Sequence, residues 1–220
     1  FSAYPKTFVK DCNSAEAAGV DCVFAPEDGE LYKNHKTFVS METLPDVLCG
    51  ASRPGHFTGV FTVVSKLFNI VSPDIAFFGQ KDIQQARCIE KMCEDLNFPV
   101  SIAILPIIRE SDGLAMSSRN VRLSSDERMQ ALSLYRTLCR TEALLAQGET
   151  RKENLQNEAM NVLGGTPARI DYAELVDYDT LLPVEVIDRQ KKYIFALAAN
   201  FGRTRLIDNM IITPEGCLYR

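Results

Sequence analysis

The sequence predicts an α/β fold, with a short parallel sheet in residues 1–108, a smaller α+β domain in residues 109–213 and a tail in residues 214–220. In the first half, near-continuous apolar strands alternate with amphipathic helices, which indicates a parallel sheet covered on both faces. After Ile108 this rhythm changes to two long helices followed by strands. Hydrophobic residues make up 46% and charged residues 24% of the 220, as in ordinary globular proteins.

The first half is expected to supply the sheet and its covering helices. Thr7 should cap a helix that runs to Ala18, and a short apolar strand follows at 20–24. A polar surface segment occupies 27–39. Apolar residues recur at three- and four-residue steps over 57–71, which predicts an amphipathic helix. A strand at 75–78, a turn at 79–82, a helix at 83–96 and a strand at 100–108 follow, so the sheet is expected to have few strands.

The second half is expected to begin with two capped helices. Ser124 and Glu127 form the S-x-x-E pattern of a capping box, which predicts a helix to about Gln147. Thr150 and Glu153 repeat this pattern and predict a second helix. Strands are expected at 169–176, 193–199 and 205–212, whereas the tail from Thr213 shows no clear element.

Composition argues against two classes of partner. The net charge of −5 disfavours a nucleic-acid ligand, which would call for a basic excess. No apolar run approaches the ~20 residues that span a membrane. The seven cysteines include no C-x-x-C pair, which indicates reduced thiols in a cytoplasmic compartment.

The turn that follows the strand at 75–78 is a candidate ligand site, because open parallel sheets bind ligands beyond the carboxyl ends of their strands. Gly79 lets the backbone approach a ligand, and Lys81 offers a charge for phosphate. Asp82 can accept hydrogen bonds from ribose or hold a metal ion through water, and Gln85 lies one helical turn on. The alternative is a solvated helix start with Asp82 as its N-cap.

A second polar cluster, Ser117-Ser118-Arg119-Asn120, follows the last strand of the first domain. Its hydroxyls and guanidinium suit a phosphate, although a generic surface turn is as common an explanation. Two such clusters at one edge of the sheet predict a nucleotide ligand, while G-x-x-x-x-G-K-[ST] and G-x-G-x-x-G are both absent.

A third candidate precedes the amphipathic helix. Arg53 and His56 can hold a carboxylate or a phosphate, and the alternative is a structural turn in which His56 caps the helix.

These segments together resemble the pantothenate synthetase (pantoate–β-alanine ligase) family. The resemblance rests on RPGHF at 53–57, GQKD at 79–82, DGLAMSSRN at 112–120 and RLIDN at 205–209. It implies an incomplete Rossmann-like nucleotidyltransferase sheet with a C-terminal lid domain. It also implies a cytoplasmic homodimer that uses ATP and Mg²⁺ to join pantoate and β-alanine through a pantoyl adenylate, with release of AMP and pyrophosphate.

The resemblance implies roles for individual residues as well. Gln85 would bind pantoate, with Arg53 and His56 as further candidates. Lys81, Ser117, Ser118 and Arg119 would be catalytic, by neutralising charge on the reacting phosphates. ATP would contact Gly79, Gln80, Lys81, Asp82, the backbone of Ile108, Met116, Ser117, Ser118 and Arg119.

Two features depart from the family pattern. Gln80 stands where the family usually has Glu, and the H-x-G-H signature that binds ATP phosphates has no match. His35 and His56, the only histidines, are too far apart in sequence to replace it. We therefore expect an N-terminally truncated chain whose activity needs the remaining segment, which a separate chain could supply.

Two alternatives to that expectation are a catalytically inactive nucleotide-binding or dimerisation module and another nucleotidylyl-transferring enzyme of the same superfamily. The second is disfavoured, because its lid would not be expected to match through to Asn209.

Overall fold

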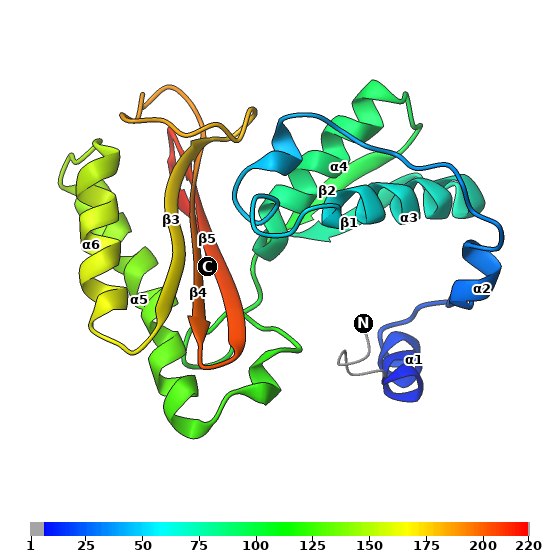
Figure 1. Cartoon of the computed structure of the whole chain (residues 1–220), viewed down its shortest axis with the longest axis horizontal. Coiled ribbons are helices and arrows are strands. Elements are labelled where there is room, and N and C mark those ends of the chain that lie inside the picture. Colours follow the sequence, from blue (N-terminus) through cyan, green and yellow to red (C-terminus); the bar gives the residue numbers. More distant parts are fainter. Residues whose placement is uncertain (1–6, 220) are drawn as a thin grey trace. The chain divides into compact units, whose positions relative to one another are not determined.

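The computed structural model describes residues 7–219, except for the side chain at position 28, and divides the chain into two compact units, residues 1–37 and 38–220 (Figure 1). No helix in the described residues is long and apolar enough to cross a membrane. The first unit contains the helices α1 (Phe8–Ala17) and α2 (Asp28–Leu31).

Two predictions for the first unit are wrong. The Thr7 side chain does not cap α1, because its hydroxyl instead donates to the Asp11 carboxylate at 3.1 Å. The segment 20–24 forms no strand, since no strand of the described residues lies beside it to pair its backbone groups. Val20, Val23 and Phe24 are accordingly about half exposed.

The second unit begins with the parallel sheet and its helices. Strands β1 (Ile75–Gly79) and β2 (Ser101–Leu105) pair in parallel, with Ile75 opposite Ser101. Ala76, Phe78 and Ile102 face a core of Phe57, Phe61, Phe68 and Ile89, which α3 (His56–Val71) and α4 (Ile83–Asp95) contribute. The short helices η1 (Leu44–Asp46) and η2 (Gln80–Asp82) precede α3 and α4.

β2 is shorter than the predicted strand at 100–108. Pro106 follows its last residue and has no backbone N–H to donate to the ladder. The residues after Pro106 therefore leave the sheet and lead toward the loop that carries residues 117–120.

The remainder of the second unit is an antiparallel sheet with two helices on one side (Figure 1). Its four strands lie in the order β3-β4-β5-β6. Leu134, Leu138, Leu155, Phe195 and Phe201 form the core between helices and sheet. The elements are η3 (Asn120–Arg122), α5 (Ser125–Ala146), α6 (Lys152–Gly164), β3 (Arg169–Asp177), β4 (Tyr193–Phe201), β5 (Thr204–Thr213) and β6 (Gly216–Leu218).

The other face of this sheet packs against the parallel part of the same unit. Ile194, Ala196 and Ile211 share a buried cluster with Ile83 at the start of α4, and Ile104 of β2 packs against it. This contact places strand β5 beside the turn that follows β1.

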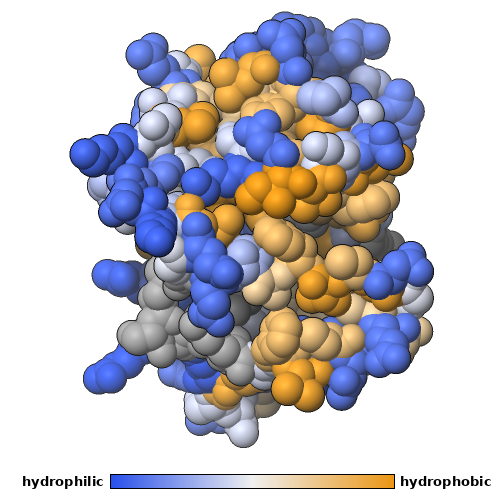
Figure 2. Space-filling model, turned by 90° about the vertical axis from the view of Figure 1, so that its right-hand side faces the viewer, coloured by the Kyte–Doolittle hydropathy of each residue, from blue (hydrophilic) through white to orange (hydrophobic). Residues whose placement is uncertain are grey.

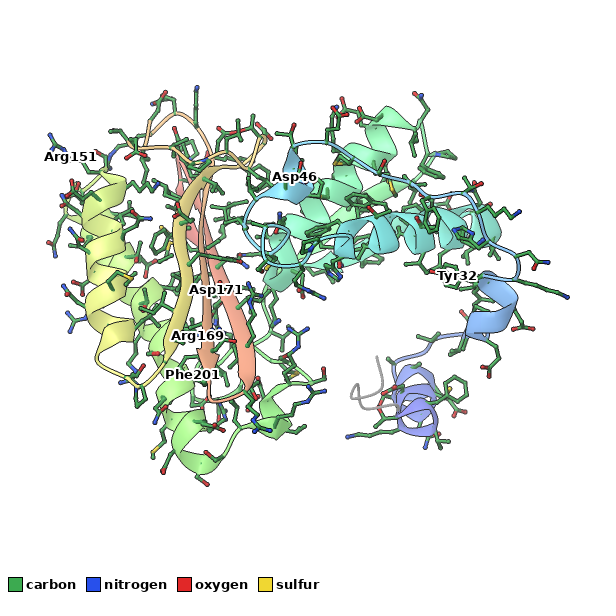
Figure 3. All side chains as sticks on the ribbon, viewed as in Figure 1. Tyr32, Asp46, Arg151, Arg169, Asp171 and Phe201 are labelled. Atoms are coloured by element: carbon green, nitrogen blue, oxygen red, sulfur yellow. The ribbon has the colours of Figure 1, made fainter. Side chains whose placement is uncertain are left out.

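Strand β6 and the start of α6 differ from the predictions. The tail was expected to have no clear element, whereas β6 pairs with β5, with Leu218 opposite Ile211. Arg151, labelled in Figure 3, is the N-cap residue of α6, so the predicted Thr150–Glu153 capping box is wrong. The Glu149 carboxylate instead accepts from the backbone N–H groups of residues 150 and 151, each at 2.8 Å.

Candidate active site

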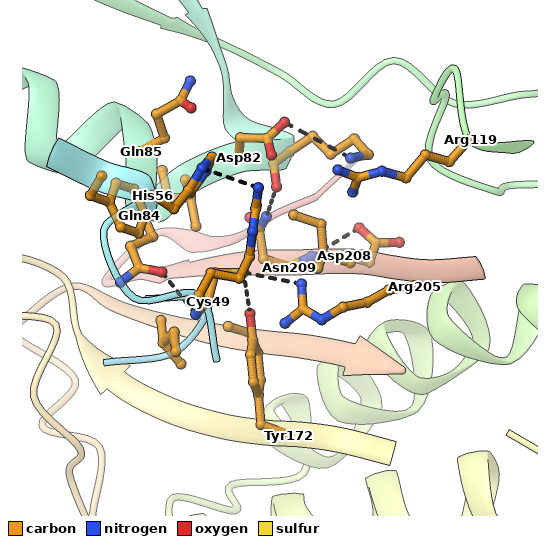
Figure 4. A pocket seen from close by; sticks show the side chains of 17 residues that line it. Cys49, His56, Asp82, Gln84, Gln85, Arg119, Tyr172, Arg205, Asp208 and Asn209 are labelled. Carbon is orange, nitrogen blue, oxygen red and sulfur yellow. Dashed lines mark hydrogen bonds and ion pairs between the residues drawn. The ribbon is translucent and has the colours of Figure 1, made fainter. Parts of the chain in front are cut away.

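A pocket lies between the turn after β1, the start of α3 and strand β5 (Figure 4). We call it the cationic pocket, because Arg53, Lys81, Arg119 and Arg205 line it. Arg53 and Lys81 come from the parallel part of the unit, and Arg119 and Arg205 come from residues that follow Ile108. The pocket therefore brings together charges from segments far apart in the sequence.

Two of these cations lack an acidic partner. Within the part of the chain that the structure describes, no carboxylate forms an ion pair with Arg53 or Arg119. Arg205 is paired with Asp171 at 2.7 Å, and Lys81 lies 3.9 Å from Asp82. The pocket thus keeps an excess of positive charge, which suits an anionic ligand.

This charge affects His56, which is the first residue of α3. Burial and the charges of Arg53 and Arg119 lower the pKa of His56 from its ordinary value. The Arg53 guanidinium lies 3.1 Å from His56 Nδ1, which accepts a hydrogen bond when the imidazole is neutral. Burial and the charge of Arg119 also lower the pKa of Arg53, which remains cationic at neutral pH.

Neither His56 nor Asp82 caps a helix. Gly55 is the N-cap residue of α3, with φ of 75°, and His56 makes no capping hydrogen bond. Asp82 occupies the N-cap position of α4, but its side chain makes no capping hydrogen bond either. The Asp82 side chain is 57% exposed and lines the pocket, so its carboxylate is available to a ligand.

The loop that carries Arg119 is held by polar contacts. Glu110 accepts from Asn120 Nδ2 at 2.6 Å and from Arg128 at 2.7 Å, and the backbone N–H of Met116 donates to the carbonyl of Ile108 at 2.9 Å. Gly113 is required here, because its φ is 95° and a Cβ would lie 2.2 Å from the Tyr135 ring.

Cys49 forms the opposite wall of the pocket. Its Sγ lies 3.1 Å from the Tyr172 hydroxyl and 3.5 Å from the Arg205 guanidinium. Its backbone N–H donates to Gln84 Oε1 at 3.0 Å. Burial and the neighbouring Cys49 raise the pKa of Tyr172, so this hydroxyl stays protonated.

The structure separates the predicted site residues into two groups. Gln85, whose side chain points away from Cys49 in Figure 4, lines the pocket with Arg53, His56, Lys81, Asp82 and Arg119. Gly79, Gln80, Ile108, Met116, Ser117 and Ser118 are not among its lining residues.

Most of the second group lies where a ligand could still reach. A Cβ at Gly79 would meet open space, the side chains of Ile108 and Met116 are 66% and 55% exposed, and Ser118 is exposed. The Ser117 hydroxyl accepts from the backbone N–H of Arg119 at 3.2 Å. Gln80 differs, because its side chain is 4% exposed and its amide is bonded within the protein.

Sequence reasoning missed four side chains of this region: Cys49, Gln84, Tyr172 and Arg205. It also assigned no role to Asp208 and Asn209, which are buried in β5. An Asp-Asn pair between apolar residues of one strand, 206–207 and 210–212, was the available signal, since buried polar groups need hydrogen-bond partners.

Comparisons with known proteins find a matching family model and similar proteins. A family model described as pantoate-beta-alanine ligase matches residues 1–211. The pantothenate synthetases of Heliobacterium modesticaldum and Acetivibrio thermocellus are 51% and 50% identical over 214 residues, which cover 96% of this chain and 75% of each relative.

Two solved structures are also similar. Pantothenate synthetase from Thermus thermophilus has a TM-score of 0.89 and 40% identity, over 94% of this chain and 75% of that one. Pantoate-beta-alanine ligase from Francisella tularensis, complexed with beta-gamma ATP and beta-alanine, has a TM-score of 0.72 and 28% identity, over 94% of this chain and 70% of that one.

Proposed function

Because the chain belongs to the pantoate-beta-alanine ligase family and is therefore a ligase of pantothenate synthesis, we propose that it joins pantoate to β-alanine in two steps through a pantoyl adenylate. The observation that carries this proposal is the convergence of Arg53, Lys81 and Arg119 on one pocket beside the carboxyl end of β1. The similar Francisella tularensis enzyme is complexed with beta-gamma ATP and beta-alanine.

In the first step, a carboxylate oxygen of pantoate attacks the α-phosphorus of ATP. The bond from that phosphorus to the bridging oxygen breaks, and pyrophosphate leaves with the electron pair. In the second step, the deprotonated amine of β-alanine attacks the acyl carbon, and the bond to the AMP oxygen breaks. Both steps need little covalent help from the protein, so positioning and charge neutralisation carry the catalysis.

The roles of individual residues are those that the family resemblance implies, and position and charge support them. We assign Lys81 and Arg119 to the phosphates, with Ser117 and Ser118 as hydrogen-bond donors from the same loop as Arg119. Gly79, the last residue of β1, and Asp82, in the turn after it, would contact the ribose. Gln85, with Arg53 and His56, would bind the pantoate carboxylate and hydroxyls. Ile108 and Met116 would receive the adenine.

Magnesium fits this site only as a partner of the nucleotide. Among the described residues, no group of three or more His, Cys, Asp or Glu side chains could hold a metal ion. Mg²⁺ commonly uses one or two carboxylates together with substrate phosphates. Asp82 is the residue that would hold it, and the ion would supply charge neutralisation at the phosphates.

We infer that the part of the chain after Ile108 moves as a lid. The cationic pocket encloses about 40 Å³, whereas small-molecule sites typically measure about 300–1,000 Å³. Contacts of Tyr172 and Arg205 with Cys49 close it across the two parts. Entry of ATP would require these contacts to open.

We also propose that two copies associate through the parallel sheet. Ile75, Phe77 and Leu105 are each about half exposed or more. Parallel sheets are normally covered on both faces, so this apolar surface needs a cover, which a second copy or the segment that carries the H-x-G-H signature would supply.

Exchange of labelled pyrophosphate into ATP tests the adenylate. With pantoate present, β-alanine absent and the segment that carries the H-x-G-H signature supplied as a separate chain, the protein should catalyse exchange, and Lys81→Ala should slow it about 100-fold. Lys191→Ala, at an exposed position outside the cationic pocket, is the control. Exchange that needs β-alanine would contradict the two-step route. ATP binding without any exchange would favour the alternative, an inactive nucleotide-binding module.

A further inference from the structure

We propose that residues 216–219, which we call the strap, position the two segments that hold the ATP phosphates. The strap consists of β6 and Tyr219, and it lies beyond the residues that the family model matches. The inference rests on the proposed function, because it assigns the strap to segments that the proposal places against ATP. Two sets of buried hydrogen bonds, one to each segment, carry it.

The first set holds the turn Gln80–Asp82. The Gln80 amide donates to the carbonyl of Leu218 at 2.7 Å and to Asn209 Oδ1 at 3.3 Å. The Asn209 amide in turn donates to the carbonyls of Gln80 at 2.9 Å and Lys81 at 3.1 Å. Because Gln80 and Asn209 are 4% and 2% exposed, these bonds are shielded from water. They fix the backbone on which the Lys81 side chain stands.

The second set holds the start of the loop that carries Ser117 and Arg119. Arg109 donates to the carbonyl of Tyr219 at 2.7 Å, to the carbonyl of Gly113 at 3.0 Å and to both oxygens of Asp208 at 2.8 and 3.0 Å. Burial raises the pKa of Asp208, and the bonds from Arg109 act in the opposite direction.

The two sets meet on neighbouring residues. Asp208 and Asn209 are consecutive in β5, and Leu218 and Tyr219 are consecutive in the strap. Each set uses one residue from each pair, so a shift of the strap moves both phosphate-binding segments together. Gln80, where the family usually has Glu, fits this arrangement. Its amide donates to the Leu218 carbonyl and to Asn209 Oδ1, whereas an ionised carboxylate has no hydrogen to donate.

The Tyr219 side chain anchors the strap. It is 1% exposed, its ring centroid lies 5.9 Å from that of Tyr135, and its hydroxyl donates to Glu142 at 2.6 Å. The Arg109 guanidinium lies over both rings, 4.7 Å from Tyr135 and 5.8 Å from Tyr219. Removal of the Tyr219 ring would therefore loosen the strap and the Arg109 contacts, whereas removal of its hydroxyl alone would cost only the bond to Glu142 and leave the ring contacts in place.

Titration calorimetry with ATP and with adenosine tests the proposal. Tyr219→Ala should weaken ATP binding about tenfold, which corresponds to about 1.4 kcal/mol, because the phosphate-binding segments lose their common anchor. The affinity of Tyr219→Ala for adenosine should stay within about twofold of the parent's, because adenosine has no phosphates to contact the segments that the strap positions. Tyr219→Phe, which keeps the ring, should restore ATP affinity. An equal loss for both ligands would indicate a merely structural role and overturn the proposal.

Lys81→Ala, measured in parallel, separates this proposal from the assigned site. If Lys81→Ala loses ATP affinity and Tyr219→Ala does not, the strap has no positioning role. If neither variant loses ATP affinity, the proposed ATP site is wrong, and the positioning role proposed for the strap is wrong too. If Tyr219→Ala does not fold, Gln80→Met replaces it, because it removes the donor to Leu218 at nearly unchanged volume. Unchanged ATP affinity in Gln80→Met would then overturn the proposal.

Discussion

His56 reports on the charge of the cationic pocket. Burial, Arg53 and Arg119 all lower its pKa, and Asp82 alone acts in the opposite direction. An anionic ligand in the pocket would offset the two arginines and raise the pKa again. The pKa of His56 therefore reports whether an anionic ligand binds beside Arg53 and Arg119.

NMR titration of the imidazole checks this prediction. In a His35→Gln variant, which leaves a single histidine, the pKa of His56 should lie below its ordinary value of 6.5 and rise when ATP is added. Arg53→Ala should also raise it, and Arg136→Ala, an exposed arginine outside the pocket, should not. A pKa at or above 6.5 in the ligand-free protein would contradict the electrostatics described above.

The same shift has a consequence for stability. Because the folded protein binds the His56 proton more weakly than the unfolded chain, His56 contributes stability above pH 6.5 that is lost as the pH falls through its folded pKa. Acidification from neutral pH should therefore destabilise the ligand-free protein.

At the scale of elements, two similar sequence patterns, one from Ser124 to Glu127 and one from Thr150 to Glu153, precede different helix starts. Ser124 accepts from the backbone N–H of Glu127 at 3.2 Å, and the Glu127 carboxylate accepts from the backbone N–H of Ser124 at 2.8 Å. The Thr150 side chain does neither, because α6 begins at Lys152 with Arg151 as its N-cap residue. The Glu149 carboxylate accepts from the backbone N–H groups of residues 150 and 151, which precede α6.

Ser124→Ala should therefore lower the free energy of unfolding by about 1 kcal/mol, the usual effect of losing an N-cap. Thr150→Ala is the matched control and should leave the free energy of unfolding within about 0.5 kcal/mol of the parent. Urea unfolding followed by circular dichroism measures both. Equal losses in the two variants would show that Thr150 caps α6 in solution.

Helices and long strands were predictable from the sequence, and the exceptions have physical causes. Periodicity predicted α3, α4 and β3 to within a few residues, because each buries one face in a core. β6 was not predicted, since its three residues are too few for a pattern and depend on pairing with β5. Conversely, residues 20–24 have the pattern of a strand but no partner in the described residues.

For the whole molecule, the sequence predicted one side of the cationic pocket and not the other. Lys81, Asp82 and Gln85 stand at the end of a recognisable strand, where ligand sites are expected. The wall formed by Cys49 and Tyr172 joins residues 123 positions apart, and Arg205 is 156 positions from Cys49. Contacts over such separations follow from how the two sheets pack, which no local pattern reports.

The parallel sheet has an exposed apolar face. Alternate residues of β1 point to opposite faces, so Ala76 and Phe78 enter the core while Ile75 and Phe77, 52% and 64% exposed, do not. Figure 2 shows hydrophobic residues lying in groups, not singly, on the face of the molecule that it presents. Surfaces of this kind in globular proteins commonly mark association sites.

Sedimentation velocity tests whether a second copy covers the face that carries Phe77. The parent should sediment as a dimer, and Phe77→Glu should sediment as a monomer, because the carboxylate would have to be desolvated in the interface. Met160→Glu changes a similarly apolar residue, 49% exposed on α6, and should leave the dimer intact. If only Met160→Glu dissociated the dimer, the interface would lie on the antiparallel part and not on β1. A monomeric parent would show that no second copy covers the apolar face of β1.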